Sequence, residues 1–321
     1  MNMEDALLQA IEDNPYDWTL WLILADWLDE HNEPERAELL RLQYILGQEA
    51  TPPHRSRQEE RLRELIAEGV RPCLPVRTNS IGMRLALVPA GTLLMGSPPS
   101  EAERPDGEPQ HEVEITQAFY AGIYAVTQEQ YQRVLGVNPS WFSSTGRGRS
   151  KVKGMDTGQF PVESVSWDET VEFCRRLSEL PEEKGDEHLY RLPTEAEWEY
   201  ICRGGPFFKT SSLPFYFGNS LSSMQANFNG NYPWGGAAKG PFLGRTTQVG
   251  SYPPNALGLY DLHGNVWEWT STLEGSSRLF RGGSWFNSAE YCTASFRYRD
   301  EPDFRDGYLG FRVLAVPSGA K

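Results

Sequence analysis

The sequence predicts a small all-α domain followed by a larger α+β domain that contains little regular secondary structure. Three observations support this fold class. Apolar residues recur at helical spacing within residues 1–50. From residue 76 onward the apolar runs are short and end at Pro or Gly, a pattern typical of strands and turns. The chain also has 30 Gly, 23 Pro and 12% aromatic residues, which favours loops stabilised by large rings over a helical bundle.

Residues 1–50 are expected to form the small helical domain. Its apolar positions fall into three runs, which are separated by the break at Asn14-Pro15 and by Pro34, a residue that suits the first turn of a helix. Trp18, Trp21 and Trp27 are interpreted as core residues. A domain of this size buries little apolar area by itself, so we expect it to dock on another surface.

Residues 51–75 are predicted to form a linker that carries a charged helix at residues 56–68. Leu62, Leu65 and Ile66 make its apolar side, and the charged residues are interpreted as a solvated side.

Residues 76–318 are predicted to form the larger domain. Capping boxes, each a Thr or Ser followed three positions later by Gln or Glu, predict helices that begin after Thr127, Ser166 and Thr194. Strand patterns lie at residues 278–285 and 310–316. Residues 207–255 show little periodicity. So long an irregular stretch needs contacts other than a sheet ladder, and a bound metal ion is one candidate.

Charge and cysteine content limit the partners and the location. The net charge of −14 disfavours nucleic acid as a partner, because a polyanion is repelled by the protein as a whole. The four cysteines show no metal-binding spacing and are interpreted as buried thiols in a reducing compartment. We see neither a signal peptide nor an apolar run long enough to span a bilayer. We therefore expect a cytoplasmic protein with no membrane partner.

Several segments together resemble the formylglycine-generating enzyme (sulfatase-modifying factor) family. They are NSIGMRLALVPAG, PVESVSWDETVEFCRRLS, YRLPTEAEWEYICRGG, GLYDLHGNVWEWT, RGGSW and LGFRV, in this order. The resemblance implies a variant C-type lectin fold. It does not settle function, because the family includes copper oxidases that make formylglycine, partner domains of sulfoxide synthases, and ligand-binding proteins that retroelements diversify. The segments ADWLDE and ERAELLRLQ resemble a short domain found at the N-termini of planctomycete-type multidomain proteins.

The resemblance also implies a structural calcium ion (Ca²⁺) at the GNVWEW segment. Its ligands would be the side chains of Asp261 and Glu268 and the carbonyl oxygens of Gly264 and Val266. Carboxylates and carbonyls in a tight loop suit calcium. The alternative is that Asp261 and Glu268 bind backbone amides nearby.

Copper chemistry is not expected. The family oxidases hold Cu(I) between two cysteines five positions apart, and here Cys292 is followed five positions later by Arg297. A single thiolate does not make the two-thiolate site that Cu(I) prefers. The five histidines are scattered and show no iron-binding cluster. A copper-dependent oxidase with Cys292 as its catalytic thiol is kept as the alternative function.

Residues 286–308 are predicted to form a ligand-binding surface. Relatives carry runs of asparagine here, and the residue types in this chain are reachable from asparagine codons by changing adenines alone, which is how diversity-generating retroelements mutate DNA. Aromatic rings with short polar side chains also resemble an antibody paratope. The alternatives are that Phe286 and Phe296 are core residues, or that the protein is a scaffold whose N-terminal domain recruits a partner. The partner expected for the surface is an unknown protein or other macromolecule. The predicted ligand-binding residues are Asn287, Ser288, Tyr291, Phe296, Tyr298, Asp300, Phe304, Asp306 and Tyr308.

Overall fold

The computed structural model describes residues 2–48, 54–98, 109–185 and 188–318. Residues 49–50 of the predicted helical domain and residues 51–53 of the predicted linker lie outside this part. Four helices come first: α1 (Met3–Asp13), α2 (Trp18–Glu30), α3 (Pro34–Gly47) and α4 (Arg55–Ala67). The predicted helical region and the predicted charged helix are therefore confirmed. In the described part of the chain, no helix is both long enough and apolar enough to cross a membrane.

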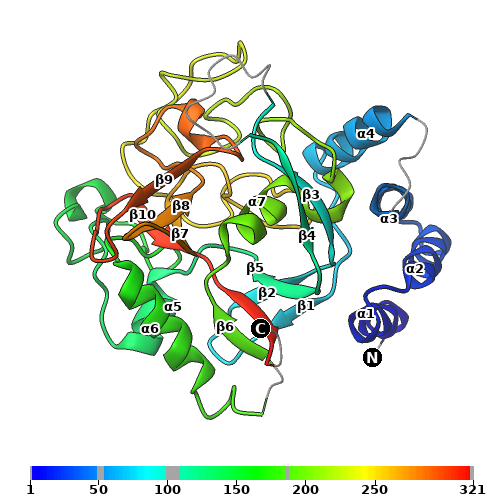
Figure 1. Ribbon diagram of the computed structural model, residues 1–321, viewed down its shortest axis with the longest axis horizontal. Helices are drawn as coiled ribbons and strands as arrows, with labels where there is room; N and C mark the ends of the chain where they lie inside the picture. The colour runs from blue at the N-terminus through cyan, green and yellow to red at the C-terminus, as the bar shows by residue number, and fades with distance from the viewer. Residues whose placement is uncertain (1, 49–53, 99–108, 186–187, 319–321) are drawn as a thin grey trace.

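The N-terminal helices lie side by side along one edge of the larger domain (Figure 1). The rings of Trp18 and Trp21 contact Phe207 of the larger domain at centroid distances of 6.4 and 6.3 Å. The buried amide of Gln43 donates a hydrogen bond to the carbonyl oxygen of Ala256 at 2.9 Å. The two regions share one continuous hydrophobic core. Docking therefore buries apolar side chains of the small domain that would be exposed if it stood alone.

Helix α4 is less solvated than the sequence predicts. Its apolar residues face inward as expected, but Arg55 and Glu59 are buried too and form an ion pair at 2.8 Å. Arg55 also donates to the carbonyl oxygens of Leu46 and Phe207. The interpretation of the charged residues of 56–68 as a solvated side is therefore wrong for Glu59, which pairs with Arg55 where Arg55 binds the larger domain.

The described part of the larger domain contains three sheets. The first has the order β1-β2-β5-β11-β6, the second β10-β7-β8-β9, and the third pairs β3 with β4. In the first sheet, β11 lies near the C-terminus in sequence and pairs antiparallel with both β5 and β6. The bounds are β1 (Val76–Thr78), β2 (Arg84–Val88), β3 (Gly91–Met95), β4 (His111–Ile115), β5 (Phe119–Gly122), β6 (His188–Arg191), β7 (Trp267–Glu274), β8 (Ser277–Arg281), β9 (Arg297–Asp300), β10 (Leu309–Phe311) and β11 (Leu314–Pro317).

Among the residues that the structure describes, three α-helices and three short 3₁₀ helices complete the domain. Each α-helix begins with the predicted capping box, in which the Thr or Ser side chain and its partner three residues later exchange hydrogen bonds. The bounds are α5 (Gln128–Leu135), α6 (Trp167–Ser178) and α7 (Glu195–Arg203), with η1 (Arg149–Val152), η2 (Gly205–Phe208) and η3 (Ala289–Cys292).

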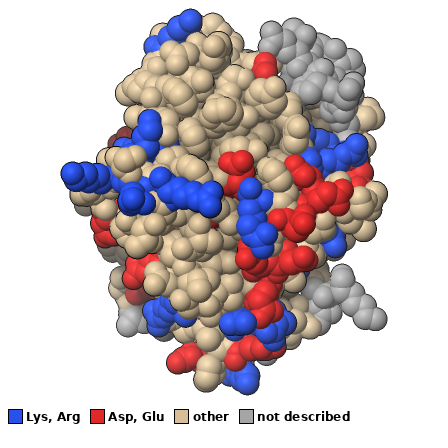
Figure 2. All heavy atoms as spheres, turned by 90° about the vertical axis from the view of Figure 1, so that its left-hand side faces the viewer, with Lys and Arg blue, Asp and Glu red and all other residues tan. Residues whose placement is uncertain are grey.

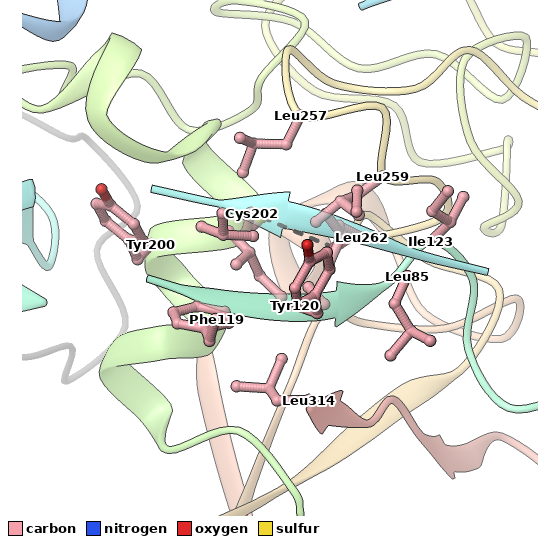
Figure 3. Close-up of a cluster of buried hydrophobic side chains, with 14 of the residues drawn as sticks. Leu85, Phe119, Tyr120, Ile123, Tyr200, Cys202, Leu257, Leu259, Leu262 and Leu314 are labelled. Carbon is pink, nitrogen blue, oxygen red and sulfur yellow. Dashed lines mark hydrogen bonds between the residues drawn. The ribbon is translucent and has the colours of Figure 1, made fainter. Parts of the chain in front are cut away.

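The main core lies between the first sheet, α7 and the loop at residues 257–262. Figure 3 shows leucines of that loop facing side chains of β2, β5 and α7. Tyr200 and Cys202 of α7 are fully buried, and the Tyr200 hydroxyl donates to the carbonyl oxygen of Pro89 at 2.9 Å. This core fixes α7, which in turn supports the second sheet.

Residues 209–255 form loops, as their lack of periodicity predicts. Side-chain amides hold these loops in place. Asn227 donates to the carbonyl oxygen of Arg245 at 3.0 Å and to the side-chain oxygen of Asn265 at 3.1 Å. The same Asn265 oxygen accepts the backbone N–H of Thr247 at 3.0 Å. Buried amide hydrogen bonds thus replace the sheet ladder that this stretch lacks.

Candidate ligand-binding face around the C-terminal segment

The second sheet forms the base of the candidate site. Strands β7 and β8 make a hairpin whose turn is Gly275-Ser276, so the short STLEGSSRLF segment is a tight hairpin and not a long loop. Strand β9 then pairs with β8, which places Tyr298 opposite Phe280. The chain from β8 to β10 therefore runs across one end of the sheet, and it contains all of residues 286–308.

Main-chain atoms anchor this segment to residues outside it. Arg281 donates to the carbonyl oxygens of Ser295 and Phe296 at 2.6 and 3.0 Å. The Trp285 indole donates to the carbonyl oxygen of Gly307 at 2.9 Å. Donors outside the segment also reach the carbonyl oxygens of Asn287, Cys292, Pro302, Asp306 and Tyr308, at 2.7–2.9 Å. Because these contacts use backbone oxygens, they do not depend on the side chains that the segment carries.

A buried ionic network supports the anchor. Arg281 pairs with Glu199, and Glu199 pairs with Arg203 at 2.8 Å, all three side chains being almost fully buried. Burial alone raises the pKa of a carboxyl group, but the two guanidinium groups keep the pKa of Glu199 below its ordinary value. The carboxylate therefore stays charged and holds Arg281 against the segment.

Two rings of the segment are well exposed. Phe286 is 57% exposed and Tyr298 is 53% exposed, so the alternative that Phe286 belongs to the core is wrong. Phe286 lies parallel to Tyr308 at a centroid distance of 6.4 Å and edge-on to Trp285 at 5.5 Å. Tyr298 rests on Phe280 at 5.5 Å.

Loops outside the segment add exposed rings that the sequence analysis missed. Phe242 stacks on Trp285 at 6.3 Å, and Trp141 packs against Gly307. The Tyr232 carbonyl accepts the backbone N–H of Ala289, at 3.0 Å. The sequence feature that could have identified them is a large aromatic residue within a polar, glycine-rich loop, where no helix or strand buries the ring. We call the exposed rings Trp141, Tyr232, Phe242, Phe286 and Tyr298 the aromatic face.

The remaining predicted rings are less accessible. Phe296 is buried against Tyr291 and Trp267, at 4.8 and 5.9 Å, so its prediction as a ligand-binding residue is corrected to a core role. Tyr291, Phe304 and Tyr308 are half-buried and pack against the hydrophobic core. One side of each ring is accessible to solvent, and the other side packs against the core.

The predicted polar residues are half-buried. The Asn287 side-chain oxygen accepts hydrogen bonds from the Trp267 indole at 2.9 Å and from the Ser284 hydroxyl at 2.6 Å. Asn287 therefore also has a structural role. Asp300 accepts the backbone N–H of Glu301 at 2.8 Å. Burial raises the pKa of Asp306. Ser288 lies where η3 begins. These side chains border the aromatic face.

Cys292 and Arg297 do not fit a copper site. Cys292 is 0% exposed, and burial raises the pKa of its thiol, so the thiolate that binds Cu(I) is disfavoured. A Cβ atom on Gly283 would lie 2.4 Å from the Cys292 sulfur, which shows how tightly the backbone covers it. Arg297 pairs with Glu195 at 3.0 Å and with Glu274 at 3.1 Å. A buried thiol and an ion-paired arginine stand where two thiolates are required. All four cysteines are buried free thiols, as predicted.

The predicted calcium ligands fit a cation in part. Asp261 has one buried carboxylate oxygen without a partner, while the other accepts the Gly250 N–H at 2.7 Å. Glu268 does not fit. Arg312 donates to both of its oxygens, at 2.8 and 3.1 Å, and the Trp198 indole donates to one at 2.7 Å. The guanidinium therefore already neutralises the charge of Glu268. No cluster of three or more metal-binding side chains occurs among the described residues.

Figure 2 shows the surface on the left-hand side of Figure 1. Charged side chains gather in its middle and lower parts, and the upper part carries few of them. The loops after residue 210 and the segment around η3 lie at this height in Figure 1. A surface poor in charge is a feature of the central part of many macromolecular interfaces.

Fold and site together define a C-type-lectin-like domain of low regular structure, with its loops gathered at one end. The chain belongs to the family of the sulfatase-modifying factor enzyme 1-like domain, whose model matches residues 76–316. The formylglycine-generating enzyme of Mus musculus is 27% identical over 298 residues, which covers 72% of this chain and 75% of that protein. The inactive Cα-formylglycine-generating enzyme 2 of Bos taurus is 35% identical over 168 residues, covering 49% of this chain and 50% of that protein.

Solved structures agree on the fold. Treponema denticola variable protein 1 superposes with a TM-score of 0.58 at 24% identity, covering 75% of this chain and 99% of that one. PvdO from Pseudomonas aeruginosa gives a TM-score of 0.58 at 25% identity, covering 75% and 97%. The predicted fold class is confirmed.

Proposed function

We propose that this protein is a non-catalytic binding protein that holds a macromolecular ligand on the aromatic face. The observation that carries the proposal is the main-chain anchoring of residues 286–308. Backbone contacts fix the course of the segment, so its outward side chains are free to serve recognition. The same arrangement tolerates replacement of those side chains, as retroelement diversification requires.

The chemistry of the face suits binding. Tyr, Phe and Trp rings supply rigid contact area at low entropic cost, and neighbouring Asn, Ser and Asp side chains offer adaptable hydrogen bonds. The rings come from separate loops and from the segment, and their exposed fractions of 41–61% make them part of an open surface. A protein or another macromolecule matches such a surface better than a metabolite does.

We propose further that formylglycine-type oxidase chemistry is absent. The buried thiol of Cys292 and the ion-paired Arg297 support this view. Relatives called inactive, in Bos taurus and Mus musculus, are examples of family members without that activity. One structural neighbour is itself called a variable protein, although its identity to this chain supports the fold alone.

Peptide display provides the test. A random peptide library is panned on the wild-type protein, and selected peptides are titrated against the variant F242A/F286A/Y298A. The control V76A/V137A/L189A removes three exposed apolar side chains that do not belong to the aromatic face. We expect the face variant to lose affinity at least about tenfold, since each buried aromatic anchor contributes about 1–2 kcal/mol, and the control to bind normally.

Two results would overturn the proposal. One is that selected peptides bind the face variant as well as they bind the wild type. The other is that the purified protein converts the cysteine of a sulfatase-derived peptide to formylglycine with oxygen and copper. Retroelement diversification has its own test in the coding DNA. It requires a near-copy of the sequence encoding residues 286–308 close to the gene, together with a reverse transcriptase gene.

A further inference from the structure

A short basic segment borders the aromatic face. Arg147, Arg149, Lys151 and Lys153 lie within seven residues, and no acidic residue occurs between positions 143 and 155. All four side chains are exposed. Within the described chain none of them pairs with a carboxylate, whereas most of the arginines do, Arg175 and Arg305 among them. We call these four residues the basic stripe.

The basic stripe is fixed to the aromatic face by packing. Gly148 lies against the Trp141 ring, since a Cβ atom there would be 2.3 Å from the indole, and its N–H donates to the Trp141 carbonyl oxygen at 2.8 Å. Val152 is buried in a small cluster with Phe142 and Phe160, on which Trp285 packs. The stripe therefore keeps a fixed position beside Trp141 of the aromatic face and close to Trp285.

A second contact joins the stripe to the loop of Phe242. The Lys151 ammonium nitrogen lies 3.7 Å from the position that a Cβ atom on Gly244 would take. In Figure 1 the loops between α5 and α6 lie on the side that faces the viewer in Figure 2. There a band of Lys and Arg crosses one side of the surface, next to the region with few charges.

Unpaired like charges at this spacing repel one another, and the chain as a whole has a net charge of −14. Acidic residues outnumber basic ones by 44 to 30, yet none of the described carboxylates pairs with these four cations. A ligand with a negative surface would relieve the repulsion and would be steered toward the face.

We propose that the ligand of the aromatic face is a protein that presents an acidic segment, and that the basic stripe binds this segment. The inference rests on the proposed function and adds the charge of the partner to it. A protein fits better than a nucleic acid. Asp300, Glu301, Asp303 and Asp306 lie on the C-terminal segment itself, where they would repel an extended polyanion. A protein can instead place its acidic residues opposite the stripe alone.

Fluorescence anisotropy with defined probes tests the proposal. The probes are a labelled polyglutamate peptide short enough to lie on the stripe without crossing the C-terminal segment, and a polylysine peptide and a single-stranded oligonucleotide of the same length. The variant R147Q/R149Q/K151Q/K153Q removes the stripe. The control R57Q/R71Q/R84Q/K184Q removes four other exposed cations that lack a carboxylate partner among the described residues. Each variant removes four positive charges, so the main difference between the two is where the charge is lost.

We expect the wild type to bind polyglutamate in preference to polylysine, with an affinity that falls as salt rises. The stripe variant should bind polyglutamate at least about tenfold more weakly, and the control should bind as the wild type does. Equal losses in both variants would overturn the proposal. If the oligonucleotide binds more tightly than polyglutamate and its binding requires the stripe, the proposal of an acidic protein is wrong and the ligand is a nucleic acid. If polyglutamate does not bind while the selected display peptides still require the aromatic face, the inference fails and the proposed function stands.

Discussion

The guanidinium of Arg312 lies 2.8 Å from the carboxylate of Glu268, and both side chains are buried. The same guanidinium donates to the carbonyl oxygens of Gly122 and Tyr260, each at 2.7 Å. Arg312 thereby joins the GNVWEW segment to β5 and to the chain before Asp261. Arg312 supplies the positive charge that the buried carboxylate of Glu268 requires.

Replacement of Arg312 should strongly destabilise the domain. We expect R312L to lower the free energy of unfolding by about 3–5 kcal/mol, because it leaves Glu268 charged, buried and unpaired. The double variant R312L/E268Q should recover part of this loss. Chemical denaturation measures both. A loss in R312L no larger than that in R84L, at an exposed arginine, would contradict the assignment.

The calcium prediction can be tested by thermal denaturation with calcium and with a chelator. Because Arg312 neutralises Glu268, we expect the midpoint to change little between the two conditions. The unpartnered oxygen of Asp261 is the atom best placed to take a cation. A calcium-dependent rise in the midpoint that D261N abolishes would restore the predicted site.

The rings of the segment should separate into two groups by their effect on stability. F286A and Y298A remove exposed rings, so we expect each to change the free energy of unfolding by about 0.5 kcal/mol or less. F304A and Y308A remove half-buried rings that pack on the core, and each should cost about 1–3 kcal/mol. Equal losses in the two groups would mean that Tyr298 and Phe286 support the fold.

The thiol of Cys292 should be unreactive in the native protein. Burial raises the pKa of all four cysteine thiols, so a thiol reagent should label them at neutral pH as unfolding exposes them. Labelling is followed by mass spectrometry with and without denaturant. Rapid native labelling of Cys292, or copper uptake that C292S abolishes, would revive the oxidase alternative.

Glu163 should make stability depend on pH. Its carboxylate accepts the backbone N–H groups of Trp141 and Phe142, at 2.9 and 2.7 Å. Burial nevertheless raises its pKa from 4.5 to about 7, and the charge of nearby Asp306 adds to the rise. A raised pKa means that the folded state binds the proton more tightly than the unfolded state does. Its contribution is therefore most favourable below about pH 4.5 and declines as pH rises to about 7.

The measurement compares wild type and E163Q across this range. We expect the wild type to lose up to about 3 kcal/mol relative to E163Q between the two pH values, because each unit of pKa shift corresponds to about 1.4 kcal/mol. The variant D261N is measured in parallel, because burial also raises the pKa of Asp261, to about 6, and Asp261 therefore contributes to the pH dependence as well. A constant difference between wild type and E163Q would show that Glu163 does not titrate in this window.

Local sequence patterns determined the helices, their capping boxes, the irregular stretch after residue 207 and the family. Capping and periodicity depend on residues a few positions apart, so the chain alone expresses them. Tertiary structure decided which rings reach the surface. Phe286 and Phe296 are the same residue type ten positions apart, yet one is exposed and the other buried. Their positions depend on contacts with Trp285, Trp267 and loops distant in sequence. Contacts of that kind also brought Trp141 and Phe242 to the face and gave Glu268 its arginine, because each requires the folded chain to bring distant residues together.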